Sequence, residues 1–130
     1  MKLQVTICSF SYKKDIPEDT SEHGGGFVFD CRSLPNPGRF PEMTDKTGND
    51  LEVIKFLEQH KQVSIFLNYT FALVGNTVEN YIQRDFTHLM VCYGCTGGQH
   101  RSVYSANMLA NYLADKYDVD VNIIHREINV

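Results

Sequence analysis

One short segment of the sequence gathers the residue types that bind phosphate groups. Its two adjacent glycines permit a turn that exposes consecutive main-chain N–H groups, and its arginine can hold two phosphate oxygens at once. A helix should begin at this arginine, so the unpaired N–H groups and the positive dipole end of that helix would face the same space. We therefore predict a phosphate-binding loop made by Thr96, Gly97, Gly98, Gln99, His100, Arg101 and Ser102.

His100 and Arg101 stand where the first turn of that helix is expected. Cations disfavour the N-terminal end of a helix. Their presence there is easier to explain if an anion occupies the space beside them. The alternative is a plain glycine turn in which Thr96 or Ser102 only caps the helix.

The same segment fits the pattern Cys-x5-Arg-Ser of cysteine-dependent phosphatases. In those enzymes the thiolate attacks phosphorus while the loop amides and the arginine hold the oxygens. The catalytic residues would then be Cys95, Arg101 and, as general acid, Asp30 or alternatively Asp45 in the proline-containing loop. However, Gly94 replaces the histidine that commonly precedes the nucleophile. In addition, an aspartate at a strand end is more often a cap, and Asp30 could instead pair with Arg32. Catalysis therefore stays an alternative to binding.

The four cysteines are expected to be reduced thiols, most of them small residues of the core. Cys92 and Cys95 have the spacing of a redox motif. In a strand, however, residues three apart point to opposite faces, and no second ligand pair for a zinc ion is found. We expect neither a metal nor a cofactor.

Hydrophobic periodicity predicts the elements that position the loop. Strands are expected over residues 3–10, 26–32, 87–94 and 119–128, and helices over 51–60, 62–84 and 101–117. The second strand is apolar enough for burial on both faces. Asp50 should cap the first helix, and Gly75 indicates a close helix crossing or a kink.

These elements predict one α/β domain over residues 1–130, a layered sandwich with a parallel or mixed sheet of about four strands covered by helices. Ligands of such sheets bind outside the carboxyl ends of the strands. Residues 11–26 and 33–49 are rich in glycine or proline and are expected to be loops. Long loops in so small a domain are often functional.

Composition narrows the class of protein. The chain has 130 residues, of which 42% are hydrophobic and 22% charged, with a net charge of -4. This length and this hydrophobic fraction suffice for one domain with a folded hydrophobic core. No apolar run is long enough to span a membrane and no signal peptide is recognised, so we expect a cytoplasmic protein. The acidic balance argues against broad nucleic-acid binding but not against a local basic pocket.

Several segments together resemble one known family. They are SFSYKKDIP at 9–17, FVFDCRSLPNPG at 27–38, TGND at 47–50, GCTGGQHRSVY at 94–104 and HRE at 125–127. They resemble the C-terminal domain of the RNase adapter protein RapZ family, over nearly the whole chain. Members usually carry an N-terminal P-loop domain. Because no GxxxxGK[ST] occurs here, we expect the C-terminal module standing alone, without ATP or GTP binding.

The resemblance implies a regulatory binding module rather than an enzyme. In the family this domain is associated with glucosamine-6-phosphate, an amino-sugar phosphate, and with small regulatory RNA. Positions 96, 97, 98, 100 and 101 carry over as the phosphate pocket, and Lys13 and Arg101 match positions associated with RNA contact. We accordingly expect RNA binding by a patch of Lys13, Arg32, Arg39, Arg101 and Arg126. The alternative to this RNA-binding patch is that these side chains form an ordinary solvated surface. The chain could also form homo-oligomers, although no sequence feature specifies them.

Overall fold

The computed structural model describes residues 2–128 and contains a four-stranded sheet in the order β2-β3-β1-β4. All three strand pairs are parallel. The predicted α/β fold is therefore confirmed, and the sheet is parallel rather than mixed. The elements are β1 (Gln4–Ser11), β2 (Gly26–Asp30), the short 3-10 helix η1 (Pro37–Arg39), α1 (Leu51–Glu58), α2 (Lys61–Gln83), β3 (His88–Cys95), α3 (Arg101–Lys116) and β4 (Asp120–His125).

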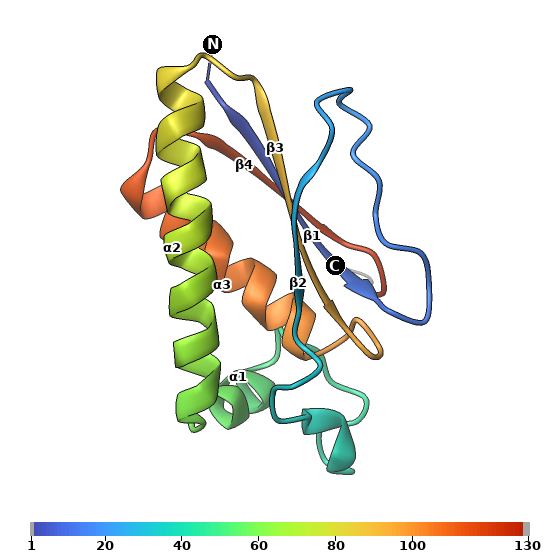
Figure 1. Ribbon diagram of the computed structural model, residues 1–130. Coiled ribbons are helices and arrows are strands. Elements are labelled where there is room, and N and C mark those ends of the chain that lie inside the picture. Colours follow the sequence, from blue (N-terminus) through green and yellow to red (C-terminus); the bar gives the residue numbers. More distant parts are fainter. Residues whose placement is uncertain (1, 129–130) are drawn as a thin grey trace.

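The three α-helices cover one face of the sheet, and the segment 12–25 after β1 crosses the other face (Figure 1). Successive side chains of a strand point to opposite faces of the sheet, so each strand contributes side chains to a hydrophobic layer on either face. Val5 and Ile7 of β1 pack into the main core with the helices, whereas Cys8 and Phe10 face the opposite side, in a smaller cluster. The central strand β1 is therefore buried on both faces.

The prediction that the second strand is buried on both faces is wrong. β2 lies at the edge of the sheet, and its exposure alternates along the strand. Phe27 and Phe29 pack against the core with their rings stacked at 5.4 Å, while Val28 is 46% exposed. The apolar run misleads because the outer face of this edge strand is left uncovered.

Two local predictions have different outcomes. Gly75 marks a close helix crossing, because a Cβ atom there would lie 2.9 Å from the hydroxyl oxygen of Tyr117, which follows α3. Asp50 stands at the N-cap position of α1 but makes no side-chain capping hydrogen bond. Its carboxylate instead accepts the main-chain N–H of Thr47 at 2.7 Å, which closes the TGND turn. Within residues 2–128, no helix combines the length and apolar character needed to cross a membrane.

Candidate phosphate-binding loop at the carboxyl edge of the sheet

The loop after β3 lies where neighbouring connections diverge. Because all strands are parallel, the segments that follow them meet at one edge of the sheet. The segment after β1 leaves over the face without helices, whereas residues 96–100 lead into α3 on the other face (Figure 1). β1 and β3 are adjacent. Ligands of open α/β sheets bind at such a divergence.

The two loop glycines have different surroundings. Gly98 has a φ of +69°, and a Cβ atom there would lie 2.8 Å from the main-chain nitrogen of Ser11 and 2.9 Å from the carbonyl carbon of Phe10. Gly98 therefore lets the loop pack directly on β1. A Cβ atom at Gly97 would meet nothing within 4 Å. The Ser11 hydroxyl fixes the loop further by donating to the carbonyl of Thr96 at 2.6 Å.

The main chain of the loop leaves its hydrogen-bond donors free. Within residues 2–128, no main-chain N–H between positions 96 and 103 donates to a protein acceptor. The first N–H that does so is that of Tyr104, which donates to the carbonyl of His100 at 3.0 Å. Thr96 and Gly97 are exposed, so these donors begin at the surface. This is the arrangement of a helix start that can bind an anion.

The side chains of Gln99 and His100 point to the proline-containing segment instead. The Gln99 amide donates to the carbonyl of Thr44 at 2.8 Å and to that of Lys46 at 2.7 Å. His100 is buried, and its Nε2–H donates to the carbonyl of Met43 at 2.9 Å. Burial lowers the pKa of His100. Both side chains therefore hold residues 43–46 against the loop, a role that the sequence did not indicate.

Arg101 is 5% exposed, and its Nη1 donates to the carbonyls of Arg32 at 2.9 Å and Leu34 at 3.0 Å. Its Nε is buried and has no hydrogen-bond partner in the described chain. No carboxylate among residues 2–128 forms an ion pair with this guanidinium. A buried charge is normally paired, whereas Arg101 is a buried cation that forms no ion pair within residues 2–128.

The residues of the catalytic alternative are engaged in other contacts. Cys95 is buried, with its Sγ 3.2 Å from the hydroxyl oxygen of Ser102. Asp30 accepts hydrogen bonds from the Arg32 guanidinium at 2.7 to 3.1 Å. This pairing lowers the pKa of Asp30, and a carboxyl with a lowered pKa is a poor general acid at neutral pH. Asp30 is therefore the partner of Arg32, the more common role of a strand-end aspartate.

The predicted RNA-binding residues are only partly brought together. Lys13, Arg32 and Arg126 follow β1, β2 and β4 at the same edge of the sheet and are exposed. Arg39 ends η1 and is also exposed, whereas Arg101 is buried. The Arg32 guanidinium lies 3.9 Å from the centre of the Tyr12 ring, so this pair forms a partly exposed platform.

The terminal HRE motif fixes the other side of the loop. His125 bridges the Ser9 hydroxyl at 2.6 Å and the Asn107 side-chain oxygen at 3.0 Å. The side chain of Glu127 is 8% exposed, pairs with Lys14 and packs near Gly98. The sequence singled out this motif only through the family resemblance, because the partners of all three residues are distant in the chain.

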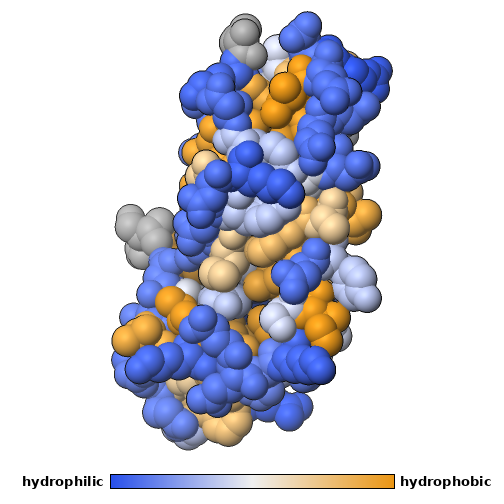
Figure 2. Space-filling view, turned by 90° about the vertical axis from the view of Figure 1, so that its left-hand side faces the viewer, coloured by the Kyte–Doolittle hydropathy of each residue, from blue (hydrophilic) through white to orange (hydrophobic). Residues whose placement is uncertain are grey.

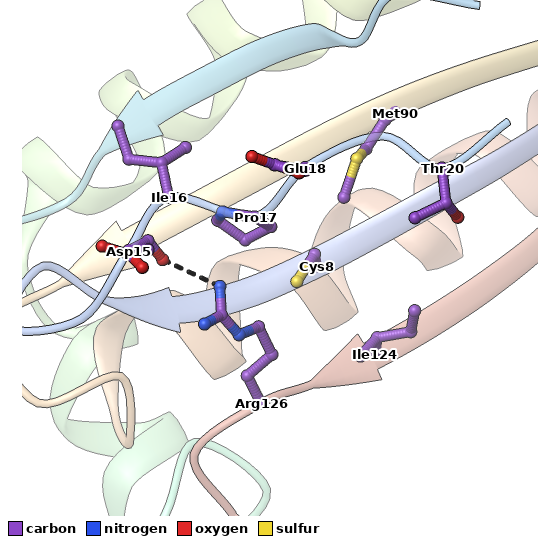
Figure 3. A pocket seen from close by; sticks show the side chains of 9 residues that line it. All are labelled: Cys8, Asp15, Ile16, Pro17, Glu18, Thr20, Met90, Ile124 and Arg126. Atoms are coloured by element: carbon purple, nitrogen blue, oxygen red, sulfur yellow. Dashed lines mark hydrogen bonds between the residues drawn. The ribbon is translucent and has the colours of Figure 1, made fainter. Parts of the chain in front are cut away.

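Arg126, the middle residue of this motif, forms a hydrogen bond with the segment 12–25 that follows β1. Its Nη1 donates to the carbonyl of Asp15 at 2.9 Å (Figure 3). Beneath this segment lies a cavity of about 580 Å³, whose floor is formed by Cys8, Met90 and Ile124 of the sheet. The cavity lies on the sheet face opposite the helices, so it is separate from the start of α3.

The fold and the loop define an α/β domain with one parallel sheet and a glycine-containing turn at its carboxyl edge, leading into a helix. Within that class, the chain belongs to the RapZ C-terminal domain family, which it matches over residues 3–129. The family predicted from the sequence is thereby confirmed.

Curated relatives agree with this assignment. The chain is 40% identical over 127 residues to a nucleotide-binding protein of Endomicrobium trichonymphae. It is 39% identical to one of Methylococcus capsulatus and 38% identical to one of Fervidobacterium nodosum. Each comparison covers 97% of this chain but only 41 to 43% of the relative. The chain thus spans about two fifths of the length of these relatives.

Proposed function

We propose that this chain is a regulatory binding module that binds a phosphorylated small molecule at residues 96–102. Its membership of the RapZ C-terminal domain family supports a regulatory binding role. The observation that carries the proposal is Arg101, a buried guanidinium whose Nε has no hydrogen-bond partner and which forms no ion pair among residues 2–128. An anion would supply the missing charge.

The main chain supports an anion at the same place. The N–H groups of residues 96–103 donate to no acceptor within residues 2–128, and they lie at or just before the start of α3, whose dipole favours negative charge. Gly97 adds open space beside them, because nothing lies within 4 Å of the position of its Cβ atom. A phosphate monoester offers three oxygens, which suits several N–H donors and one guanidinium.

The family resemblance suggests an amino-sugar phosphate, with glucosamine-6-phosphate as the first ligand to test. The similar proteins are named nucleotide-binding proteins, so a nucleoside monophosphate is the second. Both ligands share the phosphate group that the loop would bind. They differ in the remainder of the molecule, so their relative affinities would show what the surroundings of the loop select.

The proposal is tested by titration calorimetry with glucosamine-6-phosphate, glucosamine, a nucleoside monophosphate and inorganic phosphate. We expect the phosphorylated ligands to bind and glucosamine to bind at least tenfold more weakly. Arg101→Gln and Gly97→Val should each weaken binding of the phosphorylated ligands at least tenfold. Gly97→Val adds its side chain to open space and should leave folding intact. Arg39→Gln, an exposed arginine, is the matched control. Equal binding by the native protein and Gly97→Val would refute the loop as the site.

RNA binding is a second proposed function, supported by the exposed basic side chains that follow three strands at the same edge. Lys13, Arg32 and Arg126 would contact phosphates, and Tyr12 would offer a ring to a base. Two of these arginines already hold protein groups, so we expect weak binding that depends strongly on salt. Lys13→Ala should reduce the slope of log affinity against log salt by about 1. An unchanged slope would remove Lys13 from the interface.

Hydrolysis by Cys95 is the alternative that the same loop must be tested against. An aryl phosphate assay from about pH 5 to pH 8, using the native protein and Cys95→Ser, separates the two functions. We expect no turnover by either protein. Turnover that is lost in Cys95→Ser would favour catalysis.

A further inference from the structure

The redox spacing of Cys92 and Cys95 does not bring these two thiols together in the fold. Cys92 packs in the small cluster on the sheet face without helices, whereas Cys95 packs in the main core on the opposite face. The neighbour of Cys92 is Cys8. These two residues are direct partners in the parallel register of β1 and β3, and both belong to the small cluster. The structure therefore contains a thiol pair, Cys8 and Cys92, that the sequence pattern does not indicate.

The spacing of neighbouring strands permits a bond between the two sulfur atoms of this pair. Paired strands lie about 4.8 Å apart, and residues joined by a disulfide have Cα atoms about 4.4–6.8 Å apart. The Cβ atoms of a disulfide are closer, at about 3.5–4.5 Å, so the two strands must approach each other by up to about 1 Å. Only a local adjustment of the sheet is therefore needed to join Cys8 to Cys92.

A small molecule can reach Cys8 through the cavity beneath the segment 12–25. The cavity has a volume of about 580 Å³, and Cys8 lies on its floor between Met90 of β3 and Ile124 of β4 (Figure 3). Because Cys8 is only 1% exposed, the cavity suits a small uncharged oxidant rather than a bulky disulfide reagent. Hydrogen peroxide is an oxidant of this kind.

The surroundings of the pair give its two sulfur atoms different reactivities. Hydrogen bonding with the Cys92 thiol lowers the pKa of Cys8 and outweighs the opposing effect of burial, and the positive charge of Arg126 lowers this pKa further. The same hydrogen bond, together with burial, raises the pKa of Cys92. The thiolate is the nucleophilic form of cysteine, so Cys8 is the first of the two to react.

The other two cysteines provide a comparison within the same chain. Cys31 follows β2 and Cys95 ends β3, and the main-chain N–H of Cys31 donates to the carbonyl of Gly94 at 2.7 Å. The Cys31 thiol donates to the Ser105 hydroxyl oxygen at 3.7 Å, and the Cys95 sulfur lies 3.2 Å from the Ser102 hydroxyl oxygen. Both serines belong to α3, so these thiols contact the helix rather than each other.

Access also differs between the two faces of the sheet. Cys31 and Cys95 pack in the main core, between the sheet and the helices. Figure 2 views the molecule from the left-hand side of Figure 1, where α2 lies, and shows the side chains that cover the molecule on this side. Burial raises the pKa of Cys31, which keeps this thiol in its unreactive protonated form.

We propose that Cys8 and Cys92 form a peroxide-sensitive thiol pair that closes to an intramolecular disulfide. The Cys8 thiolate attacks one oxygen of hydrogen peroxide and breaks the O–O bond, which leaves a sulfenic acid on Cys8 and releases hydroxide. The hydroxide takes up the proton that the Cys8 thiol has lost and becomes water. The Cys92 sulfur then attacks the Cys8 sulfur and breaks the S–O bond, and its proton leaves with the oxygen as a second water molecule. Two thiols and one peroxide thus give one disulfide and two water molecules.

Mass spectrometry of the native chain after exposure to hydrogen peroxide at neutral pH tests the proposal without any substitution. The protein is unfolded in acid, its remaining thiols are blocked with a maleimide, and it is digested. We expect an intact chain that has lost two hydrogen atoms, with Cys8 joined to Cys92 and with Cys31 and Cys95 blocked. Dithiothreitol should restore all four thiols. Oxygen added to Met90 without a disulfide, a disulfide between Cys31 and Cys95, or disulfides only between two chains would overturn the proposal.

Alanine variants test the separate roles of the two sulfur atoms. Cys8→Ala should slow the loss of thiols to peroxide at least tenfold. Cys92→Ala should form no disulfide and should leave Cys8 as a sulfenic acid, which dimedone traps. Cys31→Ala removes a buried cysteine on the other face and is the matched control, in which the disulfide should form at the native rate. Circular dichroism verifies that each variant is folded. Equal rates of thiol loss in the native chain and Cys8→Ala, or an equal slowing in Cys31→Ala, would refute the assigned roles.

Discussion

The two adjacent glycines of the loop, Gly97 and Gly98, allow a test by the same substitution at neighbouring positions. Replacement by alanine should reduce the free energy of unfolding strongly at one position and hardly at the other. Replacing Gly98 by alanine puts a Cβ atom at a φ of +69°, a conformation that costs an L-residue about 1–2 kcal/mol. The new atom would also lie 2.8 Å from the main-chain nitrogen of Ser11 and 2.9 Å from the carbonyl carbon of Phe10. β1 is hydrogen-bonded on both sides and cannot move freely, so this overlap adds about 1–3 kcal/mol.

The free energy of unfolding of Gly98→Ala should therefore be lower by about 2–5 kcal/mol. Gly97→Ala should change it by no more than about 0.5 kcal/mol, since its Cβ atom enters open space. Urea unfolding followed by circular dichroism measures both values. For a domain of this size, melting temperature changes by roughly 3–5 °C per kcal/mol. Equal stability of the two variants, or a larger loss in Gly97→Ala, would show that the loop is not packed on β1 as described.

Three further predictions concern buried polar groups. Burial lowers the pKa of both His100 and His125, so the unfolded chain takes up protons more readily. Their contribution to the free energy of unfolding is then full above the usual histidine pKa of about 6.5 and decreases as the pH falls below it. The urea midpoint should be lower at pH 5.5 than at pH 7.5, and this difference should be smaller in His100→Gln. A higher midpoint at pH 5.5 would contradict the prediction. Tyr93→Phe removes the 2.8 Å hydrogen bond to the Thr70 hydroxyl and should cost about 1 kcal/mol in urea unfolding, whereas no loss would mean that the bond contributes nothing. The described cysteines are buried, so Ellman's reagent should label them slowly in the native protein and fully in urea; rapid labelling of the native protein would oppose that burial.

Local patterns were sufficient to predict most of the fold. The periodicity of residues 62–84 predicted the helix that runs over Lys61–Gln83, and the turn of Gly97 and Gly98 correctly separates β3 from α3. These features depend on residues close together in the chain. The burial of β2 could not be predicted in the same way, because it depends on which strand lies at the edge of the sheet.

The candidate site was predictable in position but not in its supporting contacts. Gln99 and His100 donate to main-chain carbonyls at positions 43–46, more than fifty residues earlier. Arg101 similarly donates to the carbonyls of residues 32 and 34. A carbonyl is present at every residue and has no sequence signature, so no pattern could identify these acceptors. The same contacts explain why the segment 33–49 needs little regular structure of its own.

The most direct test of the central claim is a titration of the isotopically labelled protein with inorganic phosphate, followed by amide NMR spectra at constant ionic strength. The account predicts saturable shifts concentrated in the N–H signals of residues 96–103, because these groups donate to no acceptor within residues 2–128 and lie around the start of α3. Shifts in the Arg101 Nε–H signal should accompany them. Shifts confined to exposed lysines such as Lys13, or no saturable shifts in the loop, would contradict the account.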